Sequence, residues 1–239
     1  MACPHAKTTS DERFEGFVMD EAFPCVGAKA ALVRDALEVR TFGSLRSNSE
    51  DLALWLALSD FAKTLTPGAA VVQSFAAIFP DTPELSELGF EHALWARLNG
   101  LHYIDTQMGQ RWSDDTSDDP ETDNFSLSIA GESFFVIGLH PGASRPARRF
   151  EHAALVFNSN AQFAALREDG RYDRMKTIIR KRDTELAGGI NPMLADFGQG
   201  SEAAQYSGRK VGEDWVCPFS VREPVELPPE PTRWHEAAE

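Results

Sequence analysis

Cysteine is scarce in this chain of 239 residues, which has only Cys3, Cys25 and Cys217 and no Cys-x-x-Cys pair. An odd number without paired spacing argues against a disulfide framework and against a cysteine zinc site. No stretch approaches the roughly 18 uninterrupted apolar residues of a membrane-spanning helix, and the N-terminus lacks the apolar core of a signal peptide. We therefore expect a cytoplasmic protein without a membrane partner.

Positive charge is also in the minority, since 37 acidic residues outnumber 23 Lys and Arg and give a formal charge of −14. Nucleic acids and anionic membranes reward a basic surface, so we expect neither as a partner. The cations are unevenly distributed: residues 145–182 hold 10 of the 23 and only four acids, a local balance of +6. Its first part, Arg145 to Arg149, is where we expect a small anionic ligand to bind. We expect the later part, Arg167 to Arg182, to form a helix face that is solvated or paired with the acidic segment 112–124.

The composition, 42% hydrophobic and 25% charged, is that of a globular protein with a sizeable core. Hydrophobic periodicity and turn residues predict an α+β fold: a single domain with a mostly antiparallel central sheet packed by several helices. The domain is expected over 14–219, between an N-terminal extension (1–13) and a Pro- and Glu-rich tail (220–239). We expect helices at 25–37, 47–65, 84–105 and 160–187, strands at 70–79 and 153–157, and a hairpin at 125–139.

Two motifs match known sites only in their letters. The acidic loop 112–124 lacks the Gly and Glu positions of a calcium loop, so we expect it to be solvated. The sequence Gly198-x-Gly200-x-x-Ala203 matches a dinucleotide loop, but neither a strand before it nor a βαβ unit after it is predicted. Neither motif assigns a function.

The sequence GLHPGASRPARRF, residues 138–150, carries more chemical information. A strand of core type runs directly into His140, and strand ends hold side chains firmly at the edge of a cleft. Arg145, Arg148 and Arg149 follow closely and form a set that suits anionic groups. A His beside several arginines is typical of a haem site, where the imidazole binds iron and the guanidinium groups bind propionates. The alternative is a His that caps the hairpin, with the arginines on a solvated loop.

Other side chains compete as iron ligands. His102 lies on the apolar side of the helix expected at 84–105, where a lone His is usually a core residue. Cys217, which precedes Pro218, and Cys25 are the thiol candidates, and a thiolate is the ligand in many oxygen-activating haem proteins. A buried free Cys that acts as a small hydrophobic residue is the alternative.

Three long motifs in order resemble the YqcI/YcgG family. They are AFPCVGAKAAL, the block from SDDP through NFSLSIAGESFFVIGLHPGASRPARRF, and NPMLADFGQGSEAAQYSGR followed by WVCPF. The resemblance covers about 14–219, and Ala204 stands where the family often has Arg. Characterised relatives include haem-dependent N-hydroxylases that act on a guanidine nitrogen of arginine or of a cyclic arginine derivative. Many other members have no assigned activity.

The resemblance implies haem b held by His140, with Arg145, Arg148 and Arg149 at the propionates and His102 or Cys217 as alternative ligands. It implies N-hydroxylation of a small arginine-like guanidine or amine, using O2 and an electron-transfer partner, or peroxide. Such a substrate needs a carboxylate partner, for which Glu132, Asp196 and Glu202 are candidates, with Glu202 preferred. Arg209 is expected to bind a substrate carboxylate or a propionate. A haem carrier or sensor without turnover, and a haem-free protein, remain as alternatives.

Overall fold

A five-stranded sheet forms the centre of the computed structural model, which describes residues 8–66, 68–189 and 201–225. The strand order is β1-β2-β5-β4-β3. The neighbours β1 and β2 are parallel, and the other three pairs are antiparallel. The strands are β1 (Leu37–Thr41), β2 (Ser74–Phe79), β3 (Leu127–Ile129), β4 (Glu132–Leu139) and β5 (Ala153–Ser159).

The α+β class is confirmed, and the sheet is mixed rather than mostly antiparallel. The difference arises at β1, because the sequence analysis assigned its first residue, Leu37, to the end of a helix. Parallel strands need a long crossover connection, and α3 (Asp51–Thr64) supplies it between β1 and β2.

The helices begin and end at recognisable residues. Thr9 forms a capping box with Glu12 at the start of α1, and the Ser86 hydroxyl accepts from the backbone N–H of Gly89 at the start of α4. Gly170 and Gly188, both in the left-handed region at φ +72°, bound α6. The other helices are α1 (Ser10–Met19), α2 (Val26–Val33), α4 (Glu87–Gln107), the 3-10 turn η1 (Pro146–Arg148), α5 (Asn160–Glu168), α6 (Arg171–Ala187) and α7 (Ala203–Tyr206).

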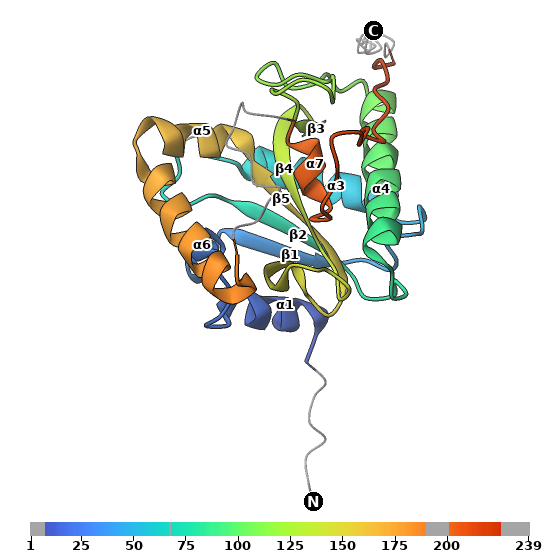
Figure 1. Ribbon diagram of the computed structural model, residues 1–239. Coiled ribbons are helices and arrows are strands. Elements are labelled where there is room, and N and C mark those ends of the chain that lie inside the picture. Colours follow the sequence, from blue (N-terminus) through green and yellow to red (C-terminus); the bar gives the residue numbers. More distant parts are fainter. Residues whose placement is uncertain (1–7, 67, 190–200, 226–239) are drawn as a thin grey trace, which may run out of the picture.

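Each face of the sheet is covered by helices, with α4 on one side of it and α6 on the other (Figure 1). Alternate side chains of β2 point to opposite faces of the sheet. Phe75 and Ala77 pack in the larger core with α3 and α4, whereas Ala76 and Ile78 pack in a smaller core with α1. We call these the first and second faces of the sheet.

Several sequence predictions are confirmed. The expected hairpin is β3 and β4, joined at Ala130 and Gly131, which both have positive φ. The helix expected at 160–187 is two helices, because Gly170 adopts the left-handed conformation between α5 and α6. Among the described residues, no helix is long and apolar enough to cross a membrane. Outside the described residues lie 1–7 of the expected extension, 198–200 of the glycine loop, Asp196, and 226–239 of the expected tail.

Gly138 sets how closely β4 approaches α4. A Cβ atom at this position would lie 2.7 Å from the Phe90 ring and 2.9 Å from Leu94. We therefore expect Gly138→Ala to lower the free energy of unfolding by about 1–3 kcal/mol through overpacking, measured by urea denaturation. Gly16→Ala is the control, because no atom lies within 4 Å of its added Cβ and Ala favours the helix. An unchanged unfolding midpoint for Gly138→Ala would contradict this packing.

Candidate functional site

A cavity of about 320 Å3 lies against the second face of the sheet, and we call it the sheet cavity. Its floor is formed by side chains of β4 and β5, including Phe135, Ile137 and Val156. The volume and the mainly apolar floor fall in the range of small-molecule sites. Because alternate residues of a strand share a face, the sheet presents these side chains as one surface.

The helix α6 covers the cavity with a single stripe. Tyr172, Met175, Ile179 and Asp183 line it at intervals of three and four residues, which places them on one side of the helix. Across from α6, Gly27 of α2 allows a close approach, since a Cβ there would lie 2.9 Å from the Met175 sulfur. The two helices therefore close this side of the cavity.

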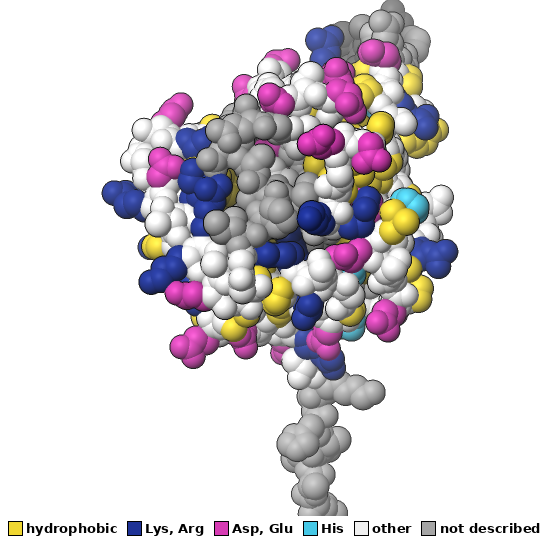
Figure 2. Space-filling view, in the orientation of Figure 1, with side chains coloured by type: hydrophobic (Ala, Val, Ile, Leu, Met, Phe, Trp, Pro, Cys, Tyr) yellow, Lys and Arg dark blue, Asp and Glu magenta, His cyan; other side chains and the backbone are white. Residues whose placement is uncertain are grey.

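The lining is strongly cationic for an acidic protein. Among the described residues, five Lys and Arg side chains contribute to it and only two acids, Asp183 and Glu202. Lys and Arg side chains gather near the centre of the face seen in Figure 2. A cavity of this charge attracts anionic groups and focuses their approach. The five cations are Arg145, Arg148, Arg167, Lys176 and Arg180.

Arg148 ties three segments together in the cavity wall. Its guanidinium donates to the carbonyl oxygens of Gly138 (2.9 Å), Tyr206 (3.2 Å) and Gln205 (3.2 Å). It forms no ion pair with a carboxylate in the described part of the chain. Burial lowers its pKa to about 10, so the group stays charged at neutral pH. This half-buried positive charge is balanced by carbonyl dipoles and, at longer range, by the Asp183 carboxylate.

The neighbouring arginines have different roles. Arg145 lines the cavity, pairs with Asp183 of α6 and donates to the Gly189 carbonyl. Arg149 lies outside the cavity lining and donates to the carbonyl oxygens of Ala143 (2.6 Å) and Ser144 (2.8 Å), which braces its own loop. Of the three predicted arginines, Arg145 and Arg148 therefore reach the cavity and Arg149 does not.

Glu202 forms the polar end of the sheet cavity together with Asn160 and Gln205. Its side chain is buried, and one carboxylate oxygen accepts from Asn160 Nδ2 at 3.3 Å. Burial raises its pKa from 4.5 to about 7. A carboxyl group in this state can bind a cationic group or hold a proton near neutral pH. The alternative Glu132 accepts instead from the Ser159 hydroxyl and does not line the cavity.

Cys25 also lines the sheet cavity, at the N-terminus of α2. Its sulfur accepts from the backbone N–H of Ala28 at 3.4 Å, which is an arrangement that favours negative charge on sulfur. Burial nevertheless raises the pKa of the thiol above its ordinary value. Cys25, Tyr172 and Met175 are the lining side chains of the types that bind haem iron.

His140 lies away from this cavity. Its ring stacks on Phe90 of α4, with the centroids 4.2 Å apart, and only 2% of the residue is exposed. The position follows from the alternation of β4, because Leu139 faces the second core and the next residue turns toward α4. Its Nδ1 atom is buried without a hydrogen-bond partner in the described ranges. The structure thus separates His140 from Arg145 and Arg148, which the sequence analysis placed in one site.

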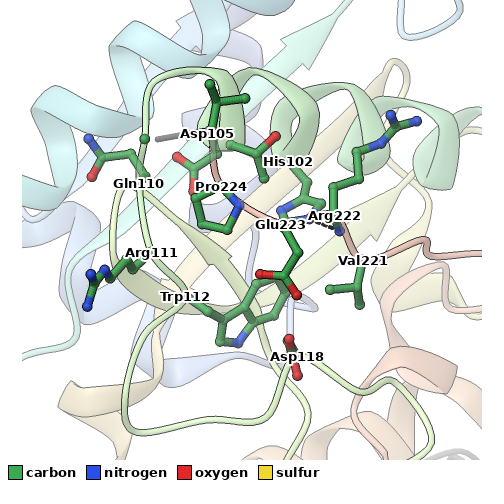
Figure 3. A pocket seen from close by; sticks show the side chains of 13 residues that line it. His102, Asp105, Gln110, Arg111, Trp112, Asp118, Val221, Arg222, Glu223 and Pro224 are labelled. Carbon is green, nitrogen blue, oxygen red and sulfur yellow. Dashed lines mark hydrogen bonds between the residues drawn. The ribbon is translucent and has the colours of Figure 1, made fainter. Parts of the chain in front are cut away.

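Three further predicted residues that the structure describes, Arg209, Cys217 and His102, also lie outside the sheet cavity. Arg209 pairs with buried Glu91 of α4 through its Nε (2.7 Å), and the same carboxylate accepts from Trp215 Nε1 at 3.0 Å. Cys217 is buried in the first core, where burial raises its pKa to about 12. His102 lines a second cavity at the C-terminal end of α4 (Figure 3).

Sequence reasoning assigned no ligand-binding role to the cavity residues of α5 and α6. Lys176 and Arg180 were expected on a solvated helix face or opposite the acidic loop, and they line the cavity instead. The sequence signal for a cavity-lining face is the mixture of apolar and basic side chains on one side of the helix, at Tyr172, Lys176, Ile179 and Arg180. Apolar and basic residues together on one helical stripe suit an amphipathic anion.

The Glu202 carboxyl is expected to make stability depend on pH. Its pKa is about 7 in the folded protein against an ordinary 4.5, so the folded state binds the proton more tightly. The contribution of Glu202 to the free energy of unfolding is therefore fully present below pH 4.5. It falls as the pH rises to about 7, where about 3 kcal/mol of the free energy of unfolding has been lost.

Glu202→Gln should remove this fall, so that the variant becomes more stable than the wild type above pH 7. The check is urea denaturation from pH 4.5 to 8, with the exposed Glu213→Gln as the matched control. Parallel pH profiles for the wild type and Glu202→Gln would show that the carboxyl does not carry this proton.

Comparisons with known proteins agree with one another. No solved structure matches the chain. An uncharacterized protein YcgG of Bacillus subtilis (strain 168) is 28% identical over 212 residues, which are 84% of this chain and 81% of that protein. A second uncharacterized protein of the same organism, YqcI, is 28% identical over 170 residues, 68% of this chain and 65% of its own length. Residues 14–220 match the YqcI/YcgG family, and the chain belongs to that family.

Proposed function

We propose that this protein is a cytoplasmic haem-dependent oxygenase that N-hydroxylates a small arginine-like guanidine or amine, with the sheet cavity as its site. The observation that carries the proposal is the sheet cavity itself, where an apolar floor meets five cationic side chains and two buried carboxyl groups, of which Asp183 pairs with Arg145 and Glu202 does not. The resemblance of the three sequence motifs supports the same activity.

The residues of the cavity fit haem in two respects. Haem is a flat apolar ring with two carboxylates, and the sheet offers a flat apolar surface with Arg145 nearby. Arg148 presents a charge that forms no direct ion pair with a carboxylate of the described residues, although Asp183 lies close enough to stabilise it. These two arginines would bind the propionates. Cys25 offers an iron ligand from the cavity wall, whereas His140 would need a rearrangement of its stack on Phe90.

Bound haem would supply the activation of O2 or peroxide that insertion of oxygen into an N–H bond requires. With O2, the reaction takes up two electrons and two protons and releases water, so an electron donor is needed; hydrogen peroxide needs none. The protein's own part is to bind the nitrogen compound, orient it and exclude water. Glu202 is placed for this role, because a carboxylate at a buried polar end pairs with a guanidinium or ammonium group.

Haem content is the first measurement. Protein from haem-supplemented expression should show a Soret band, and Arg145→Gln should weaken haem binding on the order of tenfold through loss of a propionate partner. Arg149→Gln is the matched control, since its side chain braces the loop outside the cavity. The absorption band of the CO complex distinguishes thiolate from imidazole ligation of the iron. Comparing this band in the Cys25→Ser and His140→Ala variants shows which of the two residues is the ligand. A colourless wild-type protein would falsify the haem proposal.

Turnover is the second measurement. With arginine or agmatine as substrate and peroxide or a reductase system as oxidant source, the N-hydroxylated product is to be measured by mass spectrometry. Glu202→Gln should raise KM on the order of tenfold or more for a cationic substrate, because the variant loses its charge-assisted pairing. Protein that contains haem but consumes no amine or guanidine would instead support a carrier or sensor.

A further inference from the structure

A chain of aromatic side chains leads from the sheet cavity, past the edge of the sheet, to the first face. Its members are, in order, Phe135 of β4, Tyr206 of α7, Trp95 of α4 and Trp215. Phe135 lines the sheet cavity, and the successive ring centroids lie 5.7, 5.6 and 6.4 Å apart. These are the separations of aromatic rings in direct contact. Neighbouring rings therefore connect the cavity to the first core.

The short helix α7 makes this connection because it lies at the edge of the sheet. The strand β3 pairs with β4 only over 132–134, and α7 packs against β4. Glu202 and Gln205 line the cavity on the second face. Ala203 and Tyr206, in the same turn, are buried in the first core. Residues of α7 thus reach both sides of the sheet.

Trp215 forms the outer end of the aromatic chain. It is half-buried, and the next residue, Val216, is 71% exposed. The Trp215 Nε1 donates to one oxygen of the Glu91 carboxylate at 3.0 Å, and Arg209 Nε donates to the other oxygen at 2.7 Å. An indole that loses an electron becomes positively charged, and a hydrogen-bonded carboxylate stabilises that charge. The contact with Glu91 therefore makes Trp215 easier to oxidise.

The two inner rings lack such a partner. Trp95 is 1% exposed, and its Nε1 has no hydrogen-bond partner among the described residues. The Tyr206 hydroxyl donates to the Phe134 carbonyl oxygen, which is not a base, and burial raises the pKa of the phenol. A phenol must release its proton when it is oxidised, so Tyr206 resists the loss of an electron. An oxidised side chain in this series is therefore most stable at Trp215, the ring nearest to solvent.

We propose that the aromatic chain supplies electrons to an oxidant in the sheet cavity, so that oxidising equivalents not used on a substrate leave toward the surface. The inference rests on the proposed function, because bound haem treated with peroxide supplies the oxidant. Electron transfer slows steeply with distance, so short steps between neighbouring rings are faster than one long step. The aromatic chain thus adds a protective function to the site.

The electrons and protons balance as follows. Trp95 gives one electron to the oxidant and receives one from Trp215, whose Nε1 proton moves along its hydrogen bond to Glu91. A reductant in solution, such as ascorbate, returns the electron to Trp215, and Glu91 returns the proton. Two such events, with two protons taken from water at the cavity, reduce one hydrogen peroxide to two water molecules. The two protons that ascorbate releases on oxidation restore the balance.

The cavity wall contains side chains that need this protection. Cys25 and Met175 line the sheet cavity. Oxidants convert a thiol to a sulfenic acid and a thioether to a sulfoxide, each by addition of one oxygen atom. When the aromatic chain is interrupted, oxidation should therefore move from Trp215 to these two sulfur atoms.

The test is to treat protein from haem-supplemented expression with excess hydrogen peroxide in the absence of substrate. Freeze-quench EPR, with ring-deuterated tryptophan for assignment, should show a tryptophan radical in the wild type, and Trp215→Phe should remove most of it. Peptide mass spectrometry should find oxidation products at Trp215 in the wild type and at Cys25 and Met175 in Trp215→Phe. The Soret band should bleach several-fold faster in Trp215→Phe and in Trp95→Phe.

Trp112→Phe is the matched control. Among the ring contacts of the described residues, Trp112 reaches Trp95 only through Phe219, whose ring is much harder to oxidise than an indole. Its Nε1 has no hydrogen-bond partner there that the substitution would remove. Trp112→Phe should therefore behave as the wild type in all three measurements. Trp95→Phe and Trp215→Phe each test the aromatic chain, so either can replace the other if one does not fold.

The outcomes separate this inference from the proposed function. A colourless wild type overturns both. Haem-containing protein in which Trp95→Phe and Trp215→Phe match Trp112→Phe in radical, peptide oxidation and bleaching overturns the aromatic chain alone. A radical that is lost in Trp215→Phe, in protein that forms no N-hydroxylated product, supports the aromatic chain and rejects the oxygenase.

Discussion

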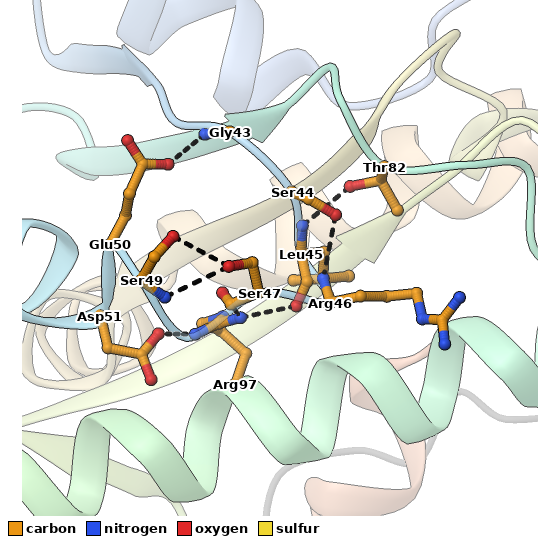
Figure 4. Close-up of polar contacts among 10 residues, drawn as sticks. All are labelled: Gly43, Ser44, Leu45, Arg46, Ser47, Ser49, Glu50, Asp51, Thr82 and Arg97. Carbon is orange, nitrogen blue, oxygen red and sulfur yellow. Dashed lines mark hydrogen bonds and ion pairs between the residues drawn. The ribbon is translucent and has the colours of Figure 1, made fainter.

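The burial of Arg97 is the constraint on which the arrangement of the first face depends. Its guanidinium is 4% exposed, pairs with Asp51 at the start of α3, and donates to the carbonyl oxygens of Leu45 (2.8 Å) and Ser47 (Figure 4). Its Nε has no hydrogen-bond partner among the described residues, so the ion pair and the two carbonyl oxygens hold the charge. Removing one partner of a buried ion pair is strongly destabilising. The pair therefore fixes α3 and the connection after β1 against α4. Since α3 is the crossover between β1 and β2, the same contact fixes the parallel edge of the sheet.

The helix α4, which carries Arg97, also holds the C-terminal part of the chain through other polar side chains. Glu91 binds Arg209 and Trp215, Asn99 Nδ2 donates to the Pro218 carbonyl, and His102 accepts from the Arg222 N–H. The segment from Glu202 to Ser207 is thereby brought beside β4, where the Tyr206 hydroxyl donates to the Phe134 carbonyl. Glu202 reaches the sheet cavity only because this segment is held on both sides, by Arg148 from the loop after β4 and by α4 through Arg209. In the described geometry Arg209 has this positioning role, and its role at a ligand stays a prediction.

The sequence was sufficient for the α+β class, the β3–β4 hairpin and the long helix α4, because each has a strong local pattern: a β-rich pair around Ala130 and Gly131, and an apolar stripe of 3.6-residue period. It was insufficient for β1, whose five residues follow a helix and pair with β2 only after the crossover by α3. It identified Glu202, Arg145 and Arg148 as site residues, and these three do meet at one cavity. It could not separate His140 from them, since which side of a strand end a residue faces depends on the register of β4 against β5 and on packing with Phe90.

The two cavities differ in charge although they belong to one acidic protein. The formal charge of −14 acts over the whole surface and repels polyanions, whereas five of the ten cations of 145–182 line the sheet cavity, from η1, α5, α6 and the residue before η1. A small anionic ligand that reaches this cavity therefore experiences a local field opposite in sign to that of the whole molecule, because exposed charges more than about a Debye length away are screened. Selection against large polyanions and attraction of a small apolar anion then follow from the same composition. The second cavity, at the C-terminal end of α4, has nearly balanced charges instead, because among its described lining residues Arg111 and Arg222 stand against Asp105, Asp118 and Glu223.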